Sequence, residues 1–137
     1  MQMQVLNASE VSNNFNSFVD KVIIEKPVVF KQNRDFIIAM SKDLVMSVFA
    51  DKTFIPVLVE EEGIITATLK DFDFVIQGRS QDEVKTKLTV ELIDYTQDYF
   101  NDFQLYYYSP NRQKHFPYIV KVLLSDSFKQ VEDLLNV

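Results

Sequence analysis

Carboxylates are the side chains in this sequence whose spacing could support chemistry. Asp71 and Asp73 lie two residues apart on a segment predicted to be extended, so both would point to one side. Asp94, Asp98 and Asp102 follow at helical spacing, one turn apart. If the two groups converged, they could hold two Mg²⁺ ions and activate water, as a metal-dependent nuclease does. The helical spacing is also typical of an ordinary solvated face, which we favour.

His115 is the only histidine, and it lies in a predicted polar loop. The sequence has no cysteine, and a catalytic zinc ion needs about three protein ligands, so no metal site is expected. We interpret His115 as a loop residue; the alternative is a basic recognition loop with Arg112 and Lys114. With two glycines in the chain, glycine-rich phosphate loops are excluded, and no serine nucleophile motif is present. We therefore expect neither an enzyme nor a bound cofactor.

The composition is that of a globular chain. Of the 137 residues, 47% are hydrophobic, which suits one large domain or two small ones. No signal peptide is apparent, and no apolar run approaches the ~18 residues of a membrane span. The lack of cysteine fits a reducing compartment, so we expect a cytoplasmic protein with no membrane contact.

The negative charge is concentrated in the second part of the chain. Residues 1–52 carry six basic and six acidic side chains, whereas residues 53–137 carry eight basic and fourteen acidic ones. The whole net charge of −6 therefore lies in the second part. An acidic surface disfavours contact with phosphates and favours a basic protein partner, although solubility alone is the more frequent reason for such charge.

The first part of the sequence predicts a short strand followed by a helix. The helix is expected to begin at Asn7, because Glu10 stands three residues later, as in a capping box. Val11 and Phe15 lie one turn apart and are expected to mark its buried face. The helix ends at Lys26–Pro27, since the residue before proline favours extended backbone.

A β-hairpin is predicted around the turn at residues 32–35, which separates two apolar runs. Arg34 stands where a tight turn favours glycine, so we expect a slightly wider loop. Ser41 is then placed to cap a short helix. The candidate boundary follows, and it divides the chain into domains of residues 1–52 and 53–137.

The second domain predicts strands, a long helix and a final helix. The long helix is expected from Ser80 to Asn101, with Glu83 completing a second capping box. Ser125 or Asp126 is expected to cap the last helix. Strands are expected at 55–59, 64–69, 74–76 and 118–124, and residues 106–108 could form another short strand. The fold class is therefore α+β, with the order ββ(β)αβ and a C-terminal helix in this domain.

An ordered series of short elements in about the first 50 residues carries a family resemblance. The elements are Asn7–Glu10 at the helix start, Asn14–Phe15, Lys26–Phe30, Asn33 at the hairpin, and Ile37–Ser41 before the second helix. In this order they resemble the N-terminal domain of the Phd/YefM antitoxins, the small repressors of bacterial toxin–antitoxin operons. The resemblance implies a β-α-β-β-α domain that forms a homodimer and binds operator DNA.

A second resemblance covers the middle of the chain. The segment from Phe74 to Val84 contains Gln77–Gly78, the hydroxyl cap Ser80 and Glu83. With the predicted order of elements it looks like the HicB antitoxin domain, a partial ribonuclease-H-like fold. The proline and glycine that usually precede this strand are absent here. That family lacks nuclease activity, which favours a solvated face for the aspartates.

The Phd/YefM resemblance implies that a dimer presents its first helix and nearby loops to a palindromic operator. The candidate DNA contacts are Asn7, Ser9 and Asn13 on the helix and Lys31, Asn33 and Arg34 at the hairpin. Two features depart from the pattern: Ser12 stands where the family commonly has a basic residue, and the domain has no net charge. Polar caps and a solvated turn explain the six residues equally well.

The second domain is the candidate toxin-binding part, since this family usually neutralises its toxin with the region after the N-terminal domain. We expect it to cover a basic toxin, a ribonuclease in this interpretation, with Tyr106, Tyr107 and Tyr108 or Phe128 as the anchor. For the three tyrosines we favour the alternative, packing inside the domain. The alternative for the whole protein is a dimeric interaction or scaffold module that keeps the antitoxin fold without binding DNA.

Overall fold

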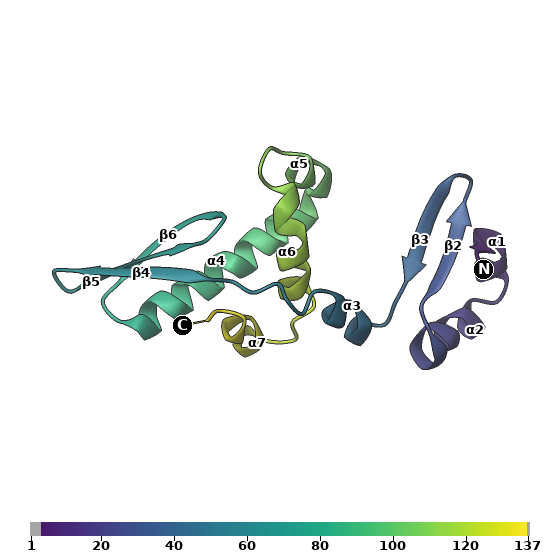
Figure 1. Ribbon diagram of the computed structural model, residues 1–137, viewed down its shortest axis with the longest axis horizontal. Coiled ribbons are helices and arrows are strands. Elements are labelled where there is room, and N and C mark those ends of the chain that lie inside the picture. Colours follow the sequence, from purple (N-terminus) through teal and green to yellow (C-terminus); the bar gives the residue numbers. More distant parts are fainter. Residues whose placement is uncertain (1–3, 137) are drawn as a thin grey trace. The chain divides into compact units, whose positions relative to one another are not determined.

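The computed structural model describes residues 4–136, and the chain divides into two compact units between Val48 and Phe49 (Figure 1). This division falls four residues before the boundary predicted after Lys52. Each unit contains helices and its own three-stranded sheet, so the fold class is α+β, as predicted.

The first unit contains a small mixed sheet in the order β1-β2-β3. β1 runs parallel to β2, and β2 and β3 form an antiparallel hairpin. The elements are β1 (Leu6–Asn7), α1 (Ala8–Asn13), α2 (Phe15–Asp20), the π-helical turn η1 (Lys21–Glu25), β2 (Val28–Gln32), β3 (Asp35–Ala39) and α3 (Lys42–Val48). The predicted order of strand, helix, hairpin and helix is therefore present.

The single helix predicted from Asn7 is interrupted. It begins as expected, with the Asn7 backbone amide donating to Glu10 Oε1 at 3.2 Å. Asn14 then leaves the helical region, with φ −144° and ψ 63°, and separates α1 from α2. Serine and asparagine at positions 12–14 are weak helix formers, which allows this break. The prediction of one continuous buried face is wrong at Phe15, whose side chain is exposed, whereas Val11 is buried.

The β2–β3 turn is tighter than predicted. Gln32 pairs with Asp35, which leaves a loop of two residues rather than a wider one. Asn33 takes the positive φ of 56°, which asparagine tolerates better than most residues, so the turn closes without glycine. Ser41 caps α3 as predicted, because its Oγ accepts a hydrogen bond from the Leu44 amide at 3.4 Å.

The second unit is built from an antiparallel sheet in the order β4-β5-β6, with α4 against one face. Glu62 and Gly63, both at positive φ, form the tight β4–β5 turn. The elements are β4 (Pro56–Glu61), β5 (Ile64–Leu69), β6 (Phe72–Gly78), α4 (Gln81–Asn101), α5 (Phe103–Tyr107), the 3₁₀ turn η2 (Gln113–His115), α6 (Phe116–Leu123) and α7 (Phe128–Asp133).

Side-chain caps fix the starts of α4 and α7. Ser80 Oγ accepts from the Glu83 amide at 3.1 Å, and the Glu83 carboxylate accepts from the Arg79 amide at 2.8 Å. The prediction for α4 is confirmed, with Glu83 reaching one residue further back than in a standard capping box. The cap of α7 is Ser127, whose Oγ accepts from the Gln130 amide at 3.2 Å, so neither Ser125 nor Asp126 holds that position.

Two strand predictions in the second unit are wrong. Residues 106–108 belong to α5 and the turn after it, and residues 118–124 form most of α6 and its end. Pro117 in the first turn of α6 favours a helix start. Lys121, which alternation would place on an exposed face, is buried and donates to the Lys52 carbonyl at 2.6 Å. The ββ(β)αβ order is therefore replaced, in residues 49–136, by three strands followed by helices.

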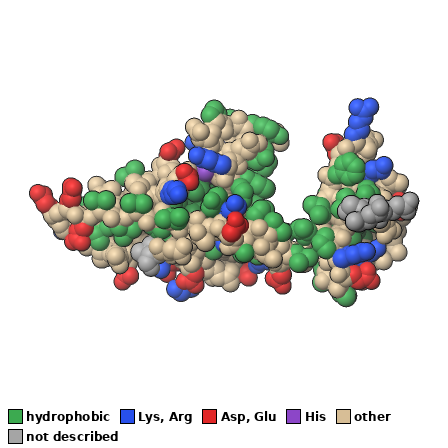
Figure 2. Space-filling view, in the orientation of Figure 1, with side chains coloured by type: hydrophobic (Ala, Val, Ile, Leu, Met, Phe, Trp, Pro, Cys, Tyr) green, Lys and Arg blue, Asp and Glu red, His purple; other side chains and the backbone are tan. Residues whose placement is uncertain are grey.

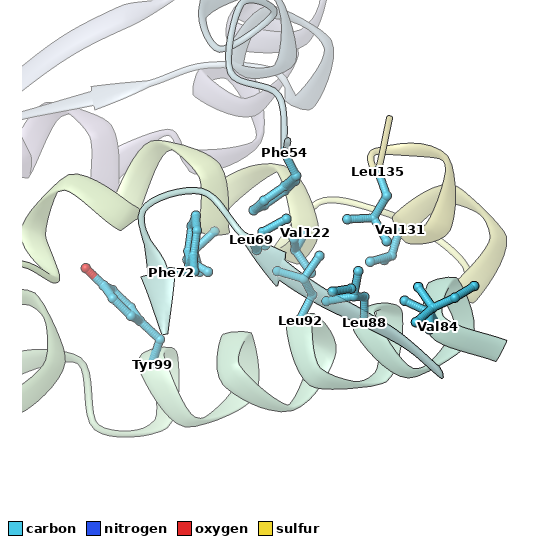
Figure 3. Packing of buried hydrophobic residues seen from close by; sticks show 13 residues of the cluster. Phe54, Leu69, Phe72, Val84, Leu88, Leu92, Tyr99, Val122, Val131 and Leu135 are labelled. Carbon is cyan, nitrogen blue, oxygen red and sulfur yellow. The ribbon is translucent and has the colours of Figure 1, made fainter. Parts of the chain in front are cut away.

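The core of the second unit lies between the sheet and α4 and is closed by α6 and α7. One face of α4 lies in this core: Val84, Leu88, Leu92 and Tyr99 are buried, and Tyr95 is half-buried. Figure 3 shows the side chains of Leu88 and Leu92 among those of Leu69, Val122 and Val131, and the same core cluster includes Phe54, Phe72 and Leu135. Phe54 and Leu135 also form a parallel backbone bridge, which joins the start of this unit to its end.

Candidate binding surfaces

All six candidate DNA contacts are exposed in the first unit. Asn7 and Lys31 are neighbours across the β1–β2 pairing, so the start of α1 lies beside β2. Asn33 and Arg34 form the tip of the hairpin, two or three residues beyond Lys31. Among residues 4–136 no carboxylate forms an ion pair with Lys31 or Arg34, so both cations are available to an anionic partner.

Ser9 and Asn13 complete this set on α1. Both side chains are exposed, and Asn13 is the last residue of α1, directly before the break at Asn14. The structure therefore brings Asn7 and Lys31 together and places the hairpin tip further along the same strand. Ser12, where the resembling family commonly carries a basic residue, is also exposed.

The sheet of the first unit has one face towards its helices and one open face. Phe30 faces the helices, because its ring contacts that of Phe18 in α2 at 5.6 Å between centroids. Lys31 points to the opposite face, and its Cα partner there is Phe36. Phe36 is 67% exposed, and Ile38 on the same face is 56% exposed.

The first unit exposes more apolar side chains than it buries. Its buried hydrophobic residues, among those described, are Val11 and Val28. Its exposed large hydrophobic residues are Val5, Phe15, Ile23, Ile24, Phe36, Ile37, Ile38, Leu44 and Val48. Exposed apolar surface on this scale is typical of a surface that another chain covers.

The predicted toxin anchors divide into packed and exposed side chains. Tyr106 and Tyr107 are half-buried and pack against the core of the second unit. Tyr107 stacks on Phe103 at 5.2 Å between ring centroids. Tyr108 is 69% exposed at the end of α5, and Phe128 is 43% exposed at the start of α7. In Figure 1, α5 and α7 lie at opposite ends of α6, so Tyr108 and Phe128 do not form one patch.

His115 is a buried residue, which corrects its interpretation as a loop side chain. It lies in η2 with 6% of its surface exposed and stacks on Phe72 at 4.1 Å between ring centroids. Its Nε2 donates to the Asp71 carbonyl at 2.6 Å, and its Nδ1 lies 2.7 Å from the Tyr95 hydroxyl. Since a carbonyl only accepts, Nε2 carries the proton and Nδ1 accepts from Tyr95.

Burial keeps this pair of side chains neutral. Loss of hydration on burial is the main cause that lowers the pKa of the His115 ring from its ordinary value. The same effect raises the pKa of Tyr95 to about 12. Both ring nitrogens of His115 are thus used: Nε2 holds η2 against the turn at Asp71, and Nδ1 holds it against α4 through Tyr95.

The aspartates do not converge in the way that a nuclease would need. Asp94 and Asp98 are exposed on α4, and Asp102, the residue directly after α4, is exposed as well. Asp71 and Asp73 instead share a surface hollow with Arg112, Lys114 and His115, so cations rather than further carboxylates are their neighbours. In the part of the chain that the structure describes, no three histidine, aspartate or glutamate residues form a group that could hold a metal ion.

Comparison with known proteins identifies the family. A family model described as antitoxin of toxin–antitoxin, RelE/RelB, TA system matches residues 1–137. The chain belongs to this antitoxin family. A crystal structure from Syntrophomonas wolfei subsp. wolfei, described as the antitoxin part of a proposed toxin/antitoxin system, is 42% identical. It superposes with a TM-score of 0.93 and covers 97% of this chain and 96% of its own. No curated protein matches.

The antitoxin family accounts for both units of the chain together. Its model extends over the first and the second unit, so the second unit is part of the antitoxin fold. Membership of this family points to a regulatory protein that acts with a toxin partner rather than to an enzyme. No helix among residues 4–136 of the antitoxin is long and apolar enough to cross a membrane.

Proposed function

We propose that this antitoxin neutralises its toxin by direct binding, as type II antitoxins do, and represses its own operon as a homodimer bound to operator DNA. The observation that carries the proposal is the match of the antitoxin family to the whole chain. We assign toxin binding to the second unit, and dimerisation and DNA binding to the first unit. The reasons for these assignments differ for each surface.

Dimerisation is supported by the apolar surface of the first unit. A unit of about 50 residues is only marginally stable alone, and this one buries few hydrophobic side chains. Covering Phe36 and Ile38 with a second copy would bury surface that water now contacts. A two-fold dimer would also present two copies of α1 and of the hairpin tip, which suits a palindromic operator.

Operator binding is supported by the polar residues around the start of α1. Asn7 and Lys31 lie side by side, and Lys31 and Arg34 have no carboxylate partner among residues 4–136. Arg34 at the hairpin tip would contact phosphates, and Lys31, which shares its face of the sheet with Phe36, would do so from the edge of the dimer interface. Asn7, Ser9, Asn13 and Asn33 could hydrogen-bond to base edges or to the backbone. Because the first domain has no net charge, binding depends on these local groups rather than on a basic field.

Toxin binding is assigned to the second unit because all of the net charge of −6 lies in residues 53–137. A protein of this charge attracts a cationic partner, and ribonucleases that bind RNA carry basic surfaces. Tyr108 and Phe128 are the predicted anchors that remain exposed.

The test combines co-purification with a gel shift. The antitoxin is co-expressed with the product of the neighbouring gene, and a stable complex is expected to co-purify through a tag on either protein. Promoter DNA from the same operon is then titrated with antitoxin at several salt concentrations, and binding should weaken as salt rises. If neither complex forms, the proposal fails.

A dimeric scaffold module is the second candidate function. Exposed Ser12, in place of the basic residue common in the resembling family, and the neutral first domain favour it. A complex with the neighbouring gene product, together with no operator binding at low salt, would select this alternative.

A further inference from the structure

The sheet of the second unit has one covered face and one open face. α4 packs on the covered face, where Leu58, Ala67 and Ile76 are Cα partners in one row. The open face alternates with it along each strand. Its two central rows, which we call the outer face, are Val57, Thr68 and Val75, followed by Val59, Thr66 and Gln77.

Five of the six residues of the outer face are exposed, Thr66 is half-buried, and none carries a charge. Val57 is 50% exposed, Val59 52% and Val75 68%. The solvated face of an antiparallel sheet usually carries polar residues. The preference of strands for β-branched residues does not by itself explain why these three residues are valines. Threonine gives a strand the same branching, as Thr66 and Thr68 do on this face, without exposing apolar surface. Three valines in these positions therefore indicate a surface that a partner covers.

Carboxylates border the outer face. Glu61 lies on the outer-face side of β4 and Glu62 in the turn that follows, at the end of the sheet where acidic side chains gather in Figure 2. Asp73 is exposed on the same side of β6. The neighbouring end of β6 contributes one basic residue, Arg79, next to Gly78. A shallow hollow lies between the uncharged rows and this acidic end, lined by Val59, Glu61, Ile64, Thr66 and Gln77.

We propose that the outer face and the carboxylates of Glu61 and Glu62 form the docking surface for the cationic toxin. This inference rests on the proposed function and locates its partner on the sheet rather than at Tyr108 or Phe128. The uncharged rows would form the dry centre of the interface. The carboxylates would pair with basic side chains at its rim, where opposite charges raise the association rate and select the partner.

The size of the outer face requires the acidic rim as part of the interface. Three strands about 4.8 Å apart and six residues long cover roughly 300 Å². A standard protein interface takes about 800 Å² from each partner, so the rim must supply much of the contact. A second copy of this chain would bring another acidic unit against these carboxylates, whereas a cationic protein would neutralise them.

The test places positive charge on the outer face. The probe is the tagged product of the neighbouring gene, and its affinity is measured for full-length antitoxin variants by biolayer interferometry. Val57→Lys/Val75→Lys is expected to weaken binding by more than ~30-fold, the effect of losing one interface hot spot. The matched control is Val90→Lys on α4, a valine that is 44% exposed, and it should bind within about twofold of wild type. Circular dichroism checks that each variant is folded.

A second variant tests the charge. Replacing Glu61 and Glu62 together by glutamine keeps their size and should slow association and reduce its dependence on salt. If wild type binds and the valine double variant binds equally well, the inference is overturned and the proposed function stands. The inference is also overturned, and the proposed function again stands, if Tyr108→Ala abolishes binding while Val57→Lys/Val75→Lys still binds. If wild type does not bind the neighbouring product at all, both fail.

Self-association provides the remaining control. Sedimentation of the antitoxin alone should give the same oligomeric state for wild type and for Val57→Lys/Val75→Lys. A variant that loses self-association would show that the outer face joins two copies of this chain, and this result would overturn the assignment to the toxin.

Discussion

Replacing Phe36 by serine should break the dimer of the first unit. Phe36 is 67% exposed on the open face of the first sheet, and Ile38 beside it is 56% exposed. A phenylalanine side chain of roughly 200 Å² would therefore leave about 130 Å² in water in the isolated chain. At about 25 cal/mol per Å², covering this area stabilises a dimer by about 3 kcal/mol for each copy.

The measured effect should be smaller than this area implies. Ordering the interface side chains and holding two molecules together offset part of the gain. We expect the dimer dissociation constant to rise by ~100-fold or more, which corresponds to about 2.7 kcal/mol shared by two copies. Sedimentation equilibrium over a wide concentration range measures this constant directly, and promoter binding should fall with it because a monomer contacts one half-site.

The matched control is Leu105→Ser, which removes a side chain that is 60% exposed on α5 of the second unit. It should leave the dimer dissociation constant within about twofold of wild type. A Phe36→Ser protein that dimerises as tightly as wild type, or a wild type that stays monomeric at every concentration, would refute the reasoning.

Three further predictions follow from single side chains. Because burial lowers the pKa of His115, the unfolded chain binds its proton first as the pH falls below about 6.5, and stability should fall by up to ~1.4 kcal/mol per pH unit there. Urea unfolding of wild type and His115→Gln at pH 7.5 and 5.5 measures this loss, and equal pH dependence in both proteins would contradict it. Leu92→Ala, at a fully buried site, should lower the free energy of unfolding by about 2–5 kcal/mol, and a change below 1 kcal/mol in the same assay would show a loosely packed core. Arg34→Ala should weaken promoter binding and reduce its salt slope by about one unit, and an unchanged gel shift would remove Arg34 from the DNA surface.

Local signals in the sequence located the starts of α1, α3 and α4. The Asn7–Glu10 and Ser80–Glu83 pairs act within one helical turn, so their geometry depends on few other residues. The strands from β4 to β6 were also predictable, because alternation and the Glu62–Gly63 turn agree there. Where one local rule was decisive and no other opposed it, the prediction was confirmed.

Signals that conflict, or that act over long distances, explain the errors. The segment 118–124 alternates like a strand, but its apolar residues also fit a buried helix, and only Pro117 distinguishes the two. His115 bonds to Tyr95 and Asp71, which are 20 and 44 residues away in the chain. No spacing rule reports such contacts. The outer face could not be predicted either, because alternation gives two faces without indicating which one α4 covers.

The bridge between Phe54 and Leu135 makes the second unit suitable for protein engineering. Phe54 and Leu135 lie side by side near its two ends, so a short peptide could connect them and new ends could be opened at Glu62–Gly63. Circular permutants and insertions into a host loop succeed when the joined ends are close and the cut lies in an exposed turn. This unit could therefore be transplanted as a cassette.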